Sequence, residues 1–256
     1  MLFLVGTGIS SKDLTISAIE IMKKSELYAD TYTSNIDTNA LNLIEAATGK
    51  NISMLSRSDM EENVHVIVGR AKDHDVSIII GGDPLIATTH KTIAIEAKKQ
   101  GVPIEVMHSS SIITVAIGES GLDFYKFGNA CTIPRWHEHY KPVSFYQTLL
   151  SNRRSNLHSL MLLDYDSKSS ASIPINEAIG ILEEAEKVYH NGLINESTKL
   201  LALLNLGRPN IKKVYGALGT LKNSKFESGP AVMILPSELA DIEIESMHAL
   251  NIVEIG

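Results

Sequence analysis

The chain is poor in aromatic residues, in cysteine and in positive charge. Phe, Tyr and Trp make up 5% of its 256 residues, so no platform for stacking nucleic-acid bases is evident. The formal net charge of −7 argues against a phosphate-backbone partner, which would require a basic face. The single cysteine, Cys131, excludes an intrachain disulfide, and its apolar neighbours predict a small buried side chain. We therefore expect no nucleic-acid partner.

Long apolar runs are also missing. None reaches membrane-spanning length, and no basic stretch precedes the first apolar segment at Leu2. We therefore expect no signal peptide, no membrane partner and a cytoplasmic location. The hydrophobic content of 44% and the charged content of 21% are typical of a soluble globular protein. The length is sufficient for one large α/β domain or for two smaller ones that share a cleft.

Strand-like and helix-like segments alternate through the first half. Strands are expected at 2–5, 27–32, 51–55, 76–80 and 103–107, and helices at 16–24, 39–48, 59–73 and 89–99. This alternation predicts a mainly parallel sheet that is covered on both faces. The second half is more mixed, with strands expected at 130–133, 158–164, 199–205, 213–215 and 231–235, and helices at 112–119, within 142–154, at 175–189 and at 237–248. We expect an N-terminal α/β domain over 1–109 and a mixed α/β domain over 110–256, with a mobile surface loop at 168–172.

The segment Gly81-Gly82-Asp83-Pro84-Leu85-Ile86-Ala87-Thr88-Thr89-His90 is the most informative part of the chain. It follows a buried apolar strand, and its two glycines leave bare backbone on which a ligand can lie. Asp83 adds one carboxylate, and Thr88 or Thr89 can cap the helix that follows. The segment is therefore either a ligand site at the edge of an open α/β sheet or an ordinary tight turn.

Three other patterns suggest chemistry. Gly6-Thr7-Gly8 resembles the start of a dinucleotide-binding turn, but Ser11 stands where the third glycine would be. His137 and His139 lack the helical spacing of a zinc protease motif, and no further Cys/His cluster completes a coordination shell, so we favour an exposed loop without metal. Asp164, at the end of an expected strand, has the position of a catalytic acid or of a cap for the loop at Lys168.

Landmarks along the whole chain resemble the diphthine synthase family. The segment GGDPLIATTH resembles that family's GDPLVATTH signature. The other landmarks, in order, are 2–8, Asp13-Leu14-Thr15, Tyr32-Thr33-Ser34, 55–59, 108–112, Gly121-Leu122 and Tyr125-Lys126-Phe127-Gly128. The resemblance implies two α/β domains of the tetrapyrrole methylase type with the cofactor cleft between them.

The resemblance also implies an activity. Members of the family transfer methyl groups from S-adenosylmethionine to the amino group of a modified histidine, 3-amino-3-carboxypropyl-histidine, on elongation factor 2. This gives diphthine in diphthamide biosynthesis. The expected partners are elongation factor 2 and a second copy of the chain, as a homodimer. The sulfonium is already activated, so a strong general base is not obligatory, and no catalytic residue is assigned.

By local alignment the resemblance implies a set of cofactor-binding residues, of which Asp83 is the best candidate for a polar anchor. Leu206 and Ala231 stand where the family usually has alanine and histidine, respectively. The full set is Ile9, Asp83, Ile86, Ser111, Ile112, Leu163, Leu206 and Ala231. Rival interpretations are a methyltransferase for tetrapyrroles or other small molecules, a nicotinamide oxidoreductase, and a non-catalytic binding module of the same fold.

Overall fold

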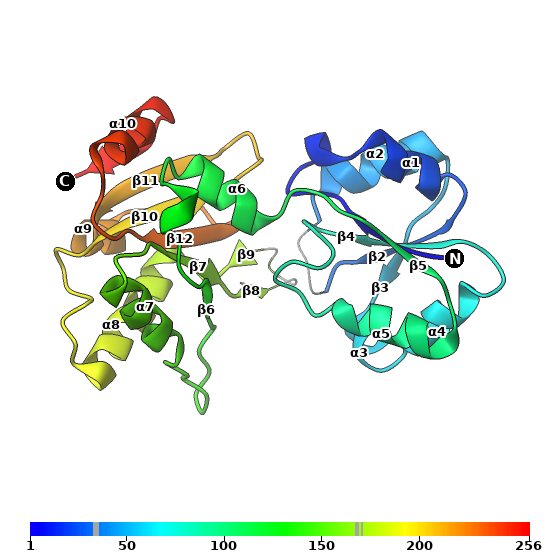
Figure 1. Ribbon diagram of the computed structural model, residues 1–256, viewed down its shortest axis with the longest axis horizontal. Helices are drawn as coiled ribbons and strands as arrows, with labels where there is room; N and C mark the ends of the chain where they lie inside the picture. The colour runs from blue at the N-terminus through cyan, green and yellow to red at the C-terminus, as the bar shows by residue number, and fades with distance from the viewer. Residues whose placement is uncertain (33–35, 167–168, 170) are drawn as a thin grey trace. The chain divides into compact units, whose positions relative to one another are not determined.

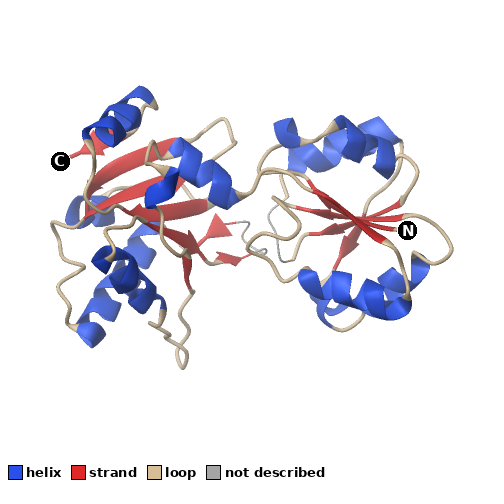
Figure 2. Ribbon diagram, in the orientation of Figure 1, coloured by secondary structure: helices blue, strands red, loops and turns tan. Residues whose placement is uncertain are grey.

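The computed structural model describes residues 1–32, 36–166, 169 and 171–256 (Figure 1). Thr33 and Ser34 of one landmark, and Lys168 and Ser170 of the expected surface loop, lie outside the described residues. The contacts within the chain divide it into two compact units, Met1–Ile112 and Ile113–Gly256. Each unit combines a sheet with helices (Figure 2), and each is described by itself below.

The first unit is built on a five-stranded sheet in the order β3-β2-β4-β1-β5. All of its neighbouring strands are parallel, which confirms the expected parallel sheet. The strands are β1 (Leu2–Gly6), β2 (Glu26–Asp30), β3 (Ser53–Leu55), β4 (Val76–Ile80) and β5 (Ile104–Met107).

Helices cover both faces of this sheet, as Figures 1 and 2 show. One face carries α1 (Ile16–Met22) and α2 (Thr38–Thr48), and the other carries α3 (Arg57–Glu61), α4 (Val64–Arg70) and α5 (Lys91–Gln100). Successive side chains of β4 enter different cores: Ile79 packs in the α1–α2 core, whereas Ile78 and Ile80 pack in the other. A strand that buries both faces reads as a near-continuous apolar run, and the sequence of β4 is apolar except for the buried Ser77.

Two local expectations for this unit were wrong. The single helix expected at 59–73 is two helices, because a capping box between Ser56 and Asp59 starts α3 at Arg57 and α4 begins separately after Asn63. Neither Thr88 nor Thr89 caps α5, since the N-cap residue is His90. The end of the helix expected at 39–48 is confirmed, because Gly49 follows as a left-handed C-cap.

The second unit contains a six-stranded mixed sheet in the order β13-β11-β10-β12-β7-β6. The pairs β6–β7 and β11–β13 are parallel, and the other neighbours are antiparallel. The strands are β6 (Cys131–Ile133), β7 (Ser159–Leu163), β10 (Lys199–Leu204), β11 (Lys212–Ala217), β12 (Ala231–Leu235) and β13 (Val253–Ile255), and a separate ribbon pairs β8 (Tyr165–Asp166) with β9 (Ala171–Ser172). The sequence did not predict β8, β9 or β13, and the expected surface loop at 168–172 was wrong for Ala171 and Ser172, which are buried in β9.

The apolar core of the second unit lies under α7 (Phe145–Arg154), α8 (Ile175–Tyr189) and α9 (Leu218–Asn223), and Tyr146 is fully buried in it. Figure 1 shows α6 (Ile112–Glu119) and α10 (Asp241–Ala249) on the opposite face of the sheet. Two short 3-10 helices complete the fold, η1 (Ser11–Asp13) in the first unit and η2 (Phe124–Lys126) in the second. Over the described ranges, the helices are too short or too polar for one of them to cross a membrane.

Candidate active site

The first sheet has a topological switch point between β1 and β4. These two strands are neighbours, yet the chain leaves β1 toward β2 on one side and leaves β4 toward β5 on the other. In open α/β sheets, ligands bind at the carboxyl ends of the strands at such a point. The turns that follow the two strands are those of Gly6-Thr7-Gly8 and Gly81-Gly82-Asp83, so both glycine turns lie at the expected place.

The two turns are joined backbone to backbone. Gly8 N donates to Gly82 O at 3.2 Å, and Gly82 N donates to Gly8 O at 2.9 Å. Both glycines have positive φ, 70° for Gly8 and 73° for Gly82. A Cβ on Gly8 would lie 2.1 Å from the Cβ of Asp13, whereas a Cβ on Gly82 would meet nothing closer than Ser110 O at 3.8 Å. The first glycine is therefore required by packing, and the second leaves open backbone.

Asp13 organises the turn after β1. Its Oδ2 accepts hydrogen bonds from Ile9 N at 3.0 Å, Ser10 N at 3.1 Å and Ser110 Oγ at 2.7 Å. Ile9 N also lies 3.2 Å from Ser110 Oγ. The carboxylate thus ties the expected cofactor residue Ile9 to the segment that follows β5. In the sequence, Asp13 stood out only as part of a landmark, because spacing does not show which backbone N–H groups donate hydrogen bonds to its carboxylate.

Asp83 is buried and holds the turn after β4 to the same segment. Its Oδ1 accepts from Leu85 N at 2.9 Å, and its Oδ2 accepts from His108 Nδ1 at 2.7 Å and from Ser109 N at 3.4 Å. Oδ1 has capacity for another donor, so a direct contact between Asp83 and the cofactor stays a prediction. The side chain of the neighbouring Ile86 is 46% exposed and is available for apolar contact.

A second buried carboxylate lies at the same edge of the sheet. Asp30 ends β2, and its Oδ2 is 2.6 Å from His90 Nε2, with both side chains fully buried. The other ring nitrogen, Nδ1, is hydrogen-bonded to Thr88 Oγ1. The sequence placed His90 in the signature segment but did not pair it with Asp30, because the two residues are 60 positions apart. The only local signal was an acid at the end of an apolar strand.

The remaining expected cofactor residues fall in two places. Ser111 is buried and Ile112 begins α6. Both directly follow the segment that donates hydrogen bonds to Asp13 and Asp83. In the second unit, Leu163, Leu206 and Ala231 are buried and gather at one edge of the sheet. Leu163 ends β7, Leu206 follows β10, and Ala231 starts the intervening strand β12. Their contact with the cofactor stays a prediction for both groups.

The other sequence patterns take structural positions. His137 and Tyr140 close an exposed turn through reciprocal backbone hydrogen bonds of 3.1 Å. Asp164 Oδ2 accepts from Arg135 N at 3.0 Å, so it joins β6 to the end of β7. Within the described part of the chain, no group of three or more His, Cys, Asp or Glu residues could hold a metal ion.

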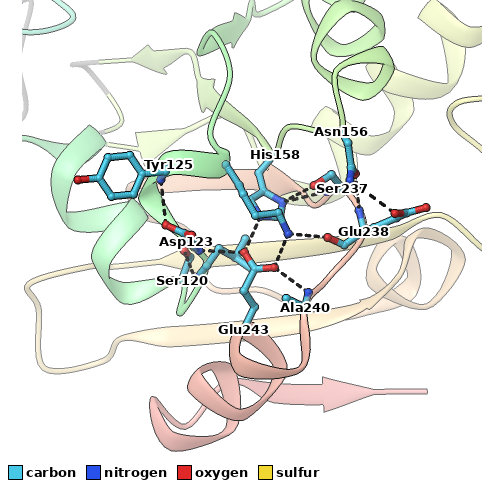
Figure 3. A network of polar contacts seen from close by, with 11 residues as sticks. Ser120, Asp123, Tyr125, Asn156, His158, Ser237, Glu238, Ala240 and Glu243 are labelled. Carbon is cyan, nitrogen blue, oxygen red and sulfur yellow. Dashed lines mark hydrogen bonds and ion pairs between the residues drawn. The ribbon is translucent and has the colours of Figure 1, made fainter.

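Figure 3 shows a polar network around Glu243 and His158 in the second unit, with Tyr125 of the 125–128 landmark beside it. At its centre, Glu243 accepts from Asp123 N at 2.9 Å, Lys126 Nζ at 2.6 Å, His158 Nε2 at 2.8 Å and Ala240 N at 2.9 Å. The carboxylate is only 2% exposed. It therefore ties α10 to η2 and to the residue before β7.

The electrostatics of this network fix its charge state. Burial acts to raise the pKa of Glu243, but the N–H donors and the Lys126 ammonium outweigh it and bring the pKa to about 2. Burial lowers the pKa of His158, which keeps its ring neutral. Its Nδ1 accepts from Ser237 N at 2.9 Å, so the proton lies on Nε2 and is donated to Glu243. The network is a satisfied structural clamp.

Two glycine turns at the switch point of an open α/β sheet indicate a ligand site, and the family of the chain identifies its class. The sequence model of the tetrapyrrole (corrin/porphyrin) methylases matches residues 1–221. The chain belongs to this family and is an S-adenosylmethionine-dependent methyltransferase.

The relatives narrow the class. The chain is 35% identical to the diphthine synthase of Methanocaldococcus jannaschii over 98% of each chain. It is 34% identical to the diphthine synthase of Staphylothermus marinus over 97% of this chain and 92% of that protein. A crystal structure of a diphthine synthase aligns with 97% of this chain and with 95% of its own chain, at 28% identity and a TM-score of 0.85. Within the methylase family, the chain therefore belongs to the diphthine synthases.

Proposed function

We propose that the chain methylates the amino group of 3-amino-3-carboxypropyl-histidine on elongation factor 2, giving diphthine in diphthamide biosynthesis. The observation that carries this proposal is the full-length similarity to diphthine synthases, at 35% identity over 98% of both chains for one relative. The resemblance separates this family from other tetrapyrrole methylases by the Ser56-Arg57 and Tyr125-Lys126-Phe127-Gly128 landmarks, and their presence supports the same substrate.

The described residues suit S-adenosylmethionine. The open backbone at Gly82 offers a surface on which the cofactor can lie, Ile86 offers an exposed apolar side chain, and Asp83 keeps the turn between them in place. We assign Ile9, Ser111 and Ile112 to the same binding surface, and Leu163, Leu206 and Ala231 to a second apolar surface for the cofactor. The bound cofactor supplies an activated methyl group. The task left to the protein is to bind, to align an unprotonated amine and to exclude water.

We further propose that the chain acts in the cytoplasm as a homodimer. Two-fold dimers are the commonest soluble oligomers, and the family resemblance supports this arrangement. Light scattering at micromolar concentration is then expected to give about twice the 28.0 kDa chain mass. A monomer with full activity would contradict the dimer without touching the proposed reaction.

The deciding experiment is a transfer assay with methyl-labelled S-adenosylmethionine. The substrates are elongation factor 2 that carries the aminocarboxypropyl group and, as the matched control, the unmodified factor. Label is expected on the modified factor alone, because the unmodified imidazole lacks the amine that attacks the methyl group. Transfer to a free tetrapyrrole or to RNA, with none to the modified factor, would refute the proposed function.

A further inference from the structure

Three polar side chains form a line from the core of the first unit to the loop after Gly81-Gly82-Asp83. Asp30 and His90 are fully buried and lie 2.6 Å apart. Thr88, which is half-buried, is hydrogen-bonded through Oγ1 to the other nitrogen of the same imidazole ring. The line therefore begins at a carboxylate under the sheet edge and ends at a hydroxyl in the loop that carries Asp83 and Ile86.

This line can take up a proton without moving a heavy atom. With Asp30 ionised, His90 donates Nε2–H to the carboxylate, and its Nδ1 accepts from the Thr88 hydroxyl. If the ring gains a second proton, Nδ1–H donates to Thr88 Oγ1 instead, and the Asp30 carboxylate balances the new charge. An imidazole that links a carboxylate to a hydroxyl has the arrangement that activates hydroxyl groups in hydrolytic triads.

Fastening the loop does not by itself require these groups. Burial of a carboxylate and an imidazole carries a desolvation cost that packed apolar side chains avoid. The backbone is also strained here, because Ala87 has a φ of 55°, which is uncommon for a residue with a side chain. Strain of this kind concentrates at ligand sites. The strained residue Ala87 lies between Ile86 and Thr88. Ile86 is exposed and would contact the ligand, whereas Thr88 is the outer end of the line of polar side chains.

We propose that the Thr88 hydroxyl accepts the proton that the substrate amine releases, and that Asp30 and His90 are positioning residues that form the relay behind it. The inference rests on the proposed function. As the amine nitrogen forms its bond to the methyl carbon, the sulfur–methyl bond breaks and its electron pair stays on sulfur. The proton leaves the methylated nitrogen for Thr88 Oγ1, and the hydroxyl proton passes to His90 Nδ1. Reversal of the relay then returns the proton to water.

The test uses the full-length enzyme with modified elongation factor 2 and labelled S-adenosylmethionine. Thr88→Val removes the hydroxyl at nearly constant shape, and Thr88→Ser restores it. Thr89→Val is the matched control, because Thr89 is the exposed neighbouring threonine. We expect Thr88→Val to lower kcat by about 100-fold, the scale of general acid–base catalysis, with KM and the calorimetric affinity for S-adenosylmethionine within about twofold of wild type. Thr88→Ser and Thr89→Val should keep kcat within about threefold.

A double variant tests whether Asp30 and Thr88 act as a unit, whereas rescue by serine at unchanged cofactor affinity separates a relay from a structural tie. Asp30→Asn should add little to the kcat loss of Thr88→Val, since residues that act as a unit are not additive. If Asp30→Asn fails to fold, the Val and Ser variants at Thr88 still decide the question. Wild-type kcat in Thr88→Val, or a loss that follows cofactor affinity and is not restored by serine, would overturn the relay alone. A wild-type enzyme that leaves the modified factor unmethylated would overturn the proposed function, and the relay with it.

Discussion

Replacement of Glu243 by Gln should destabilise the second unit by about 3 kcal/mol. The carboxylate has a pKa of about 2 in the folded protein against an ordinary 4.5. Because each pKa unit is worth about 1.4 kcal/mol, this gap corresponds to roughly 3 kcal/mol of stability at neutral pH. Glutamine keeps the shape but leaves the Lys126 ammonium without its charged partner. Removal of one member of a buried pair typically costs about 3–5 kcal/mol, which agrees in size.

The assay can be confined to the correct unit. Trp136 is the single tryptophan and packs against the core of the second unit, so its fluorescence reports the unfolding of that unit in urea or on heating. A loss of about 3 kcal/mol should lower the melting temperature by roughly 6–12 °C in a unit of this size. Glu238→Gln is the matched control, because the Glu238 side chain is exposed and contacts Asn156 at 3.5 Å, whereas the backbone bonds of Glu238 with Lys126 and Asn156 are kept in the variant. An equal loss in the control, or an unchanged midpoint in Glu243→Gln, would refute the reasoning.

The dependence on pH gives the sign of the effect independently. A carboxylate with a lowered pKa adds stability that is fully present above pH 4.5 and is lost as the pH falls toward 2. The difference between wild type and Glu243→Gln should therefore be constant from about pH 8 to about pH 5 and shrink below pH 4.5. Separately, the lowered pKa of His158 reduces the stability of the folded protein itself as the pH falls below 6.5. A difference that grows on acidification would contradict the assigned charge state.

Three further outcomes are expected. Asp83→Ala should weaken S-adenosylmethionine binding by about 1–3 kcal/mol in calorimetry, since the turn loses its charge-assisted hydrogen bonds to His108 and Ser109. In Gly82→Ala the new Cβ would meet no atom closer than 3.8 Å, so the free energy of unfolding should fall by only about 1–2 kcal/mol, because of the positive φ. Unchanged cofactor affinity in this variant would show that no ligand lies on this backbone. Cys131 is half-buried rather than fully buried as expected, and this partial burial raises the pKa of its thiol to about 12. A thiol reagent at pH 8 should therefore label it slowly in the native protein and fast in urea; equal rates would contradict the raised pKa.

Residues that are buried on a regular pattern were predictable from the sequence. The bounds of β4, α8 and β12 agree with the expected 76–80, 175–189 and 231–235, because an apolar run or an amphipathic period determines each of them. The helix expected at 59–73 begins earlier, at Arg57, because of the Ser56–Asp59 capping box, and it is divided between Glu61 and Val64. The edge strand β13 was missed because it has three residues and pairs with one neighbour only.

In the polar sites, too, the sequence predicted some features and missed others. The glycine turns and Asp83 were identified because their residue types suit a strand end. The partners of the carboxylates were not, because Asp30 with His90 and Glu243 with His158 are joined over 60 and 85 positions of sequence. Spacing carries no information at such separations. Only the strand order brings these side chains together.

The turn after β1 has a further consequence for the charge of what it can bind. From Thr7 to Ser11, five successive backbone N–H groups already donate within the unit: to Ile80 O, to Gly82 O, to Asp13 Oδ2 twice and to an oxygen of Asp37. A glycine turn that cradles a pyrophosphate needs those N–H groups turned outward and unfilled. Here a carboxylate occupies the place of the anion. A dinucleotide would meet a negative charge where it needs donors, whereas a sulfonium meets no such conflict.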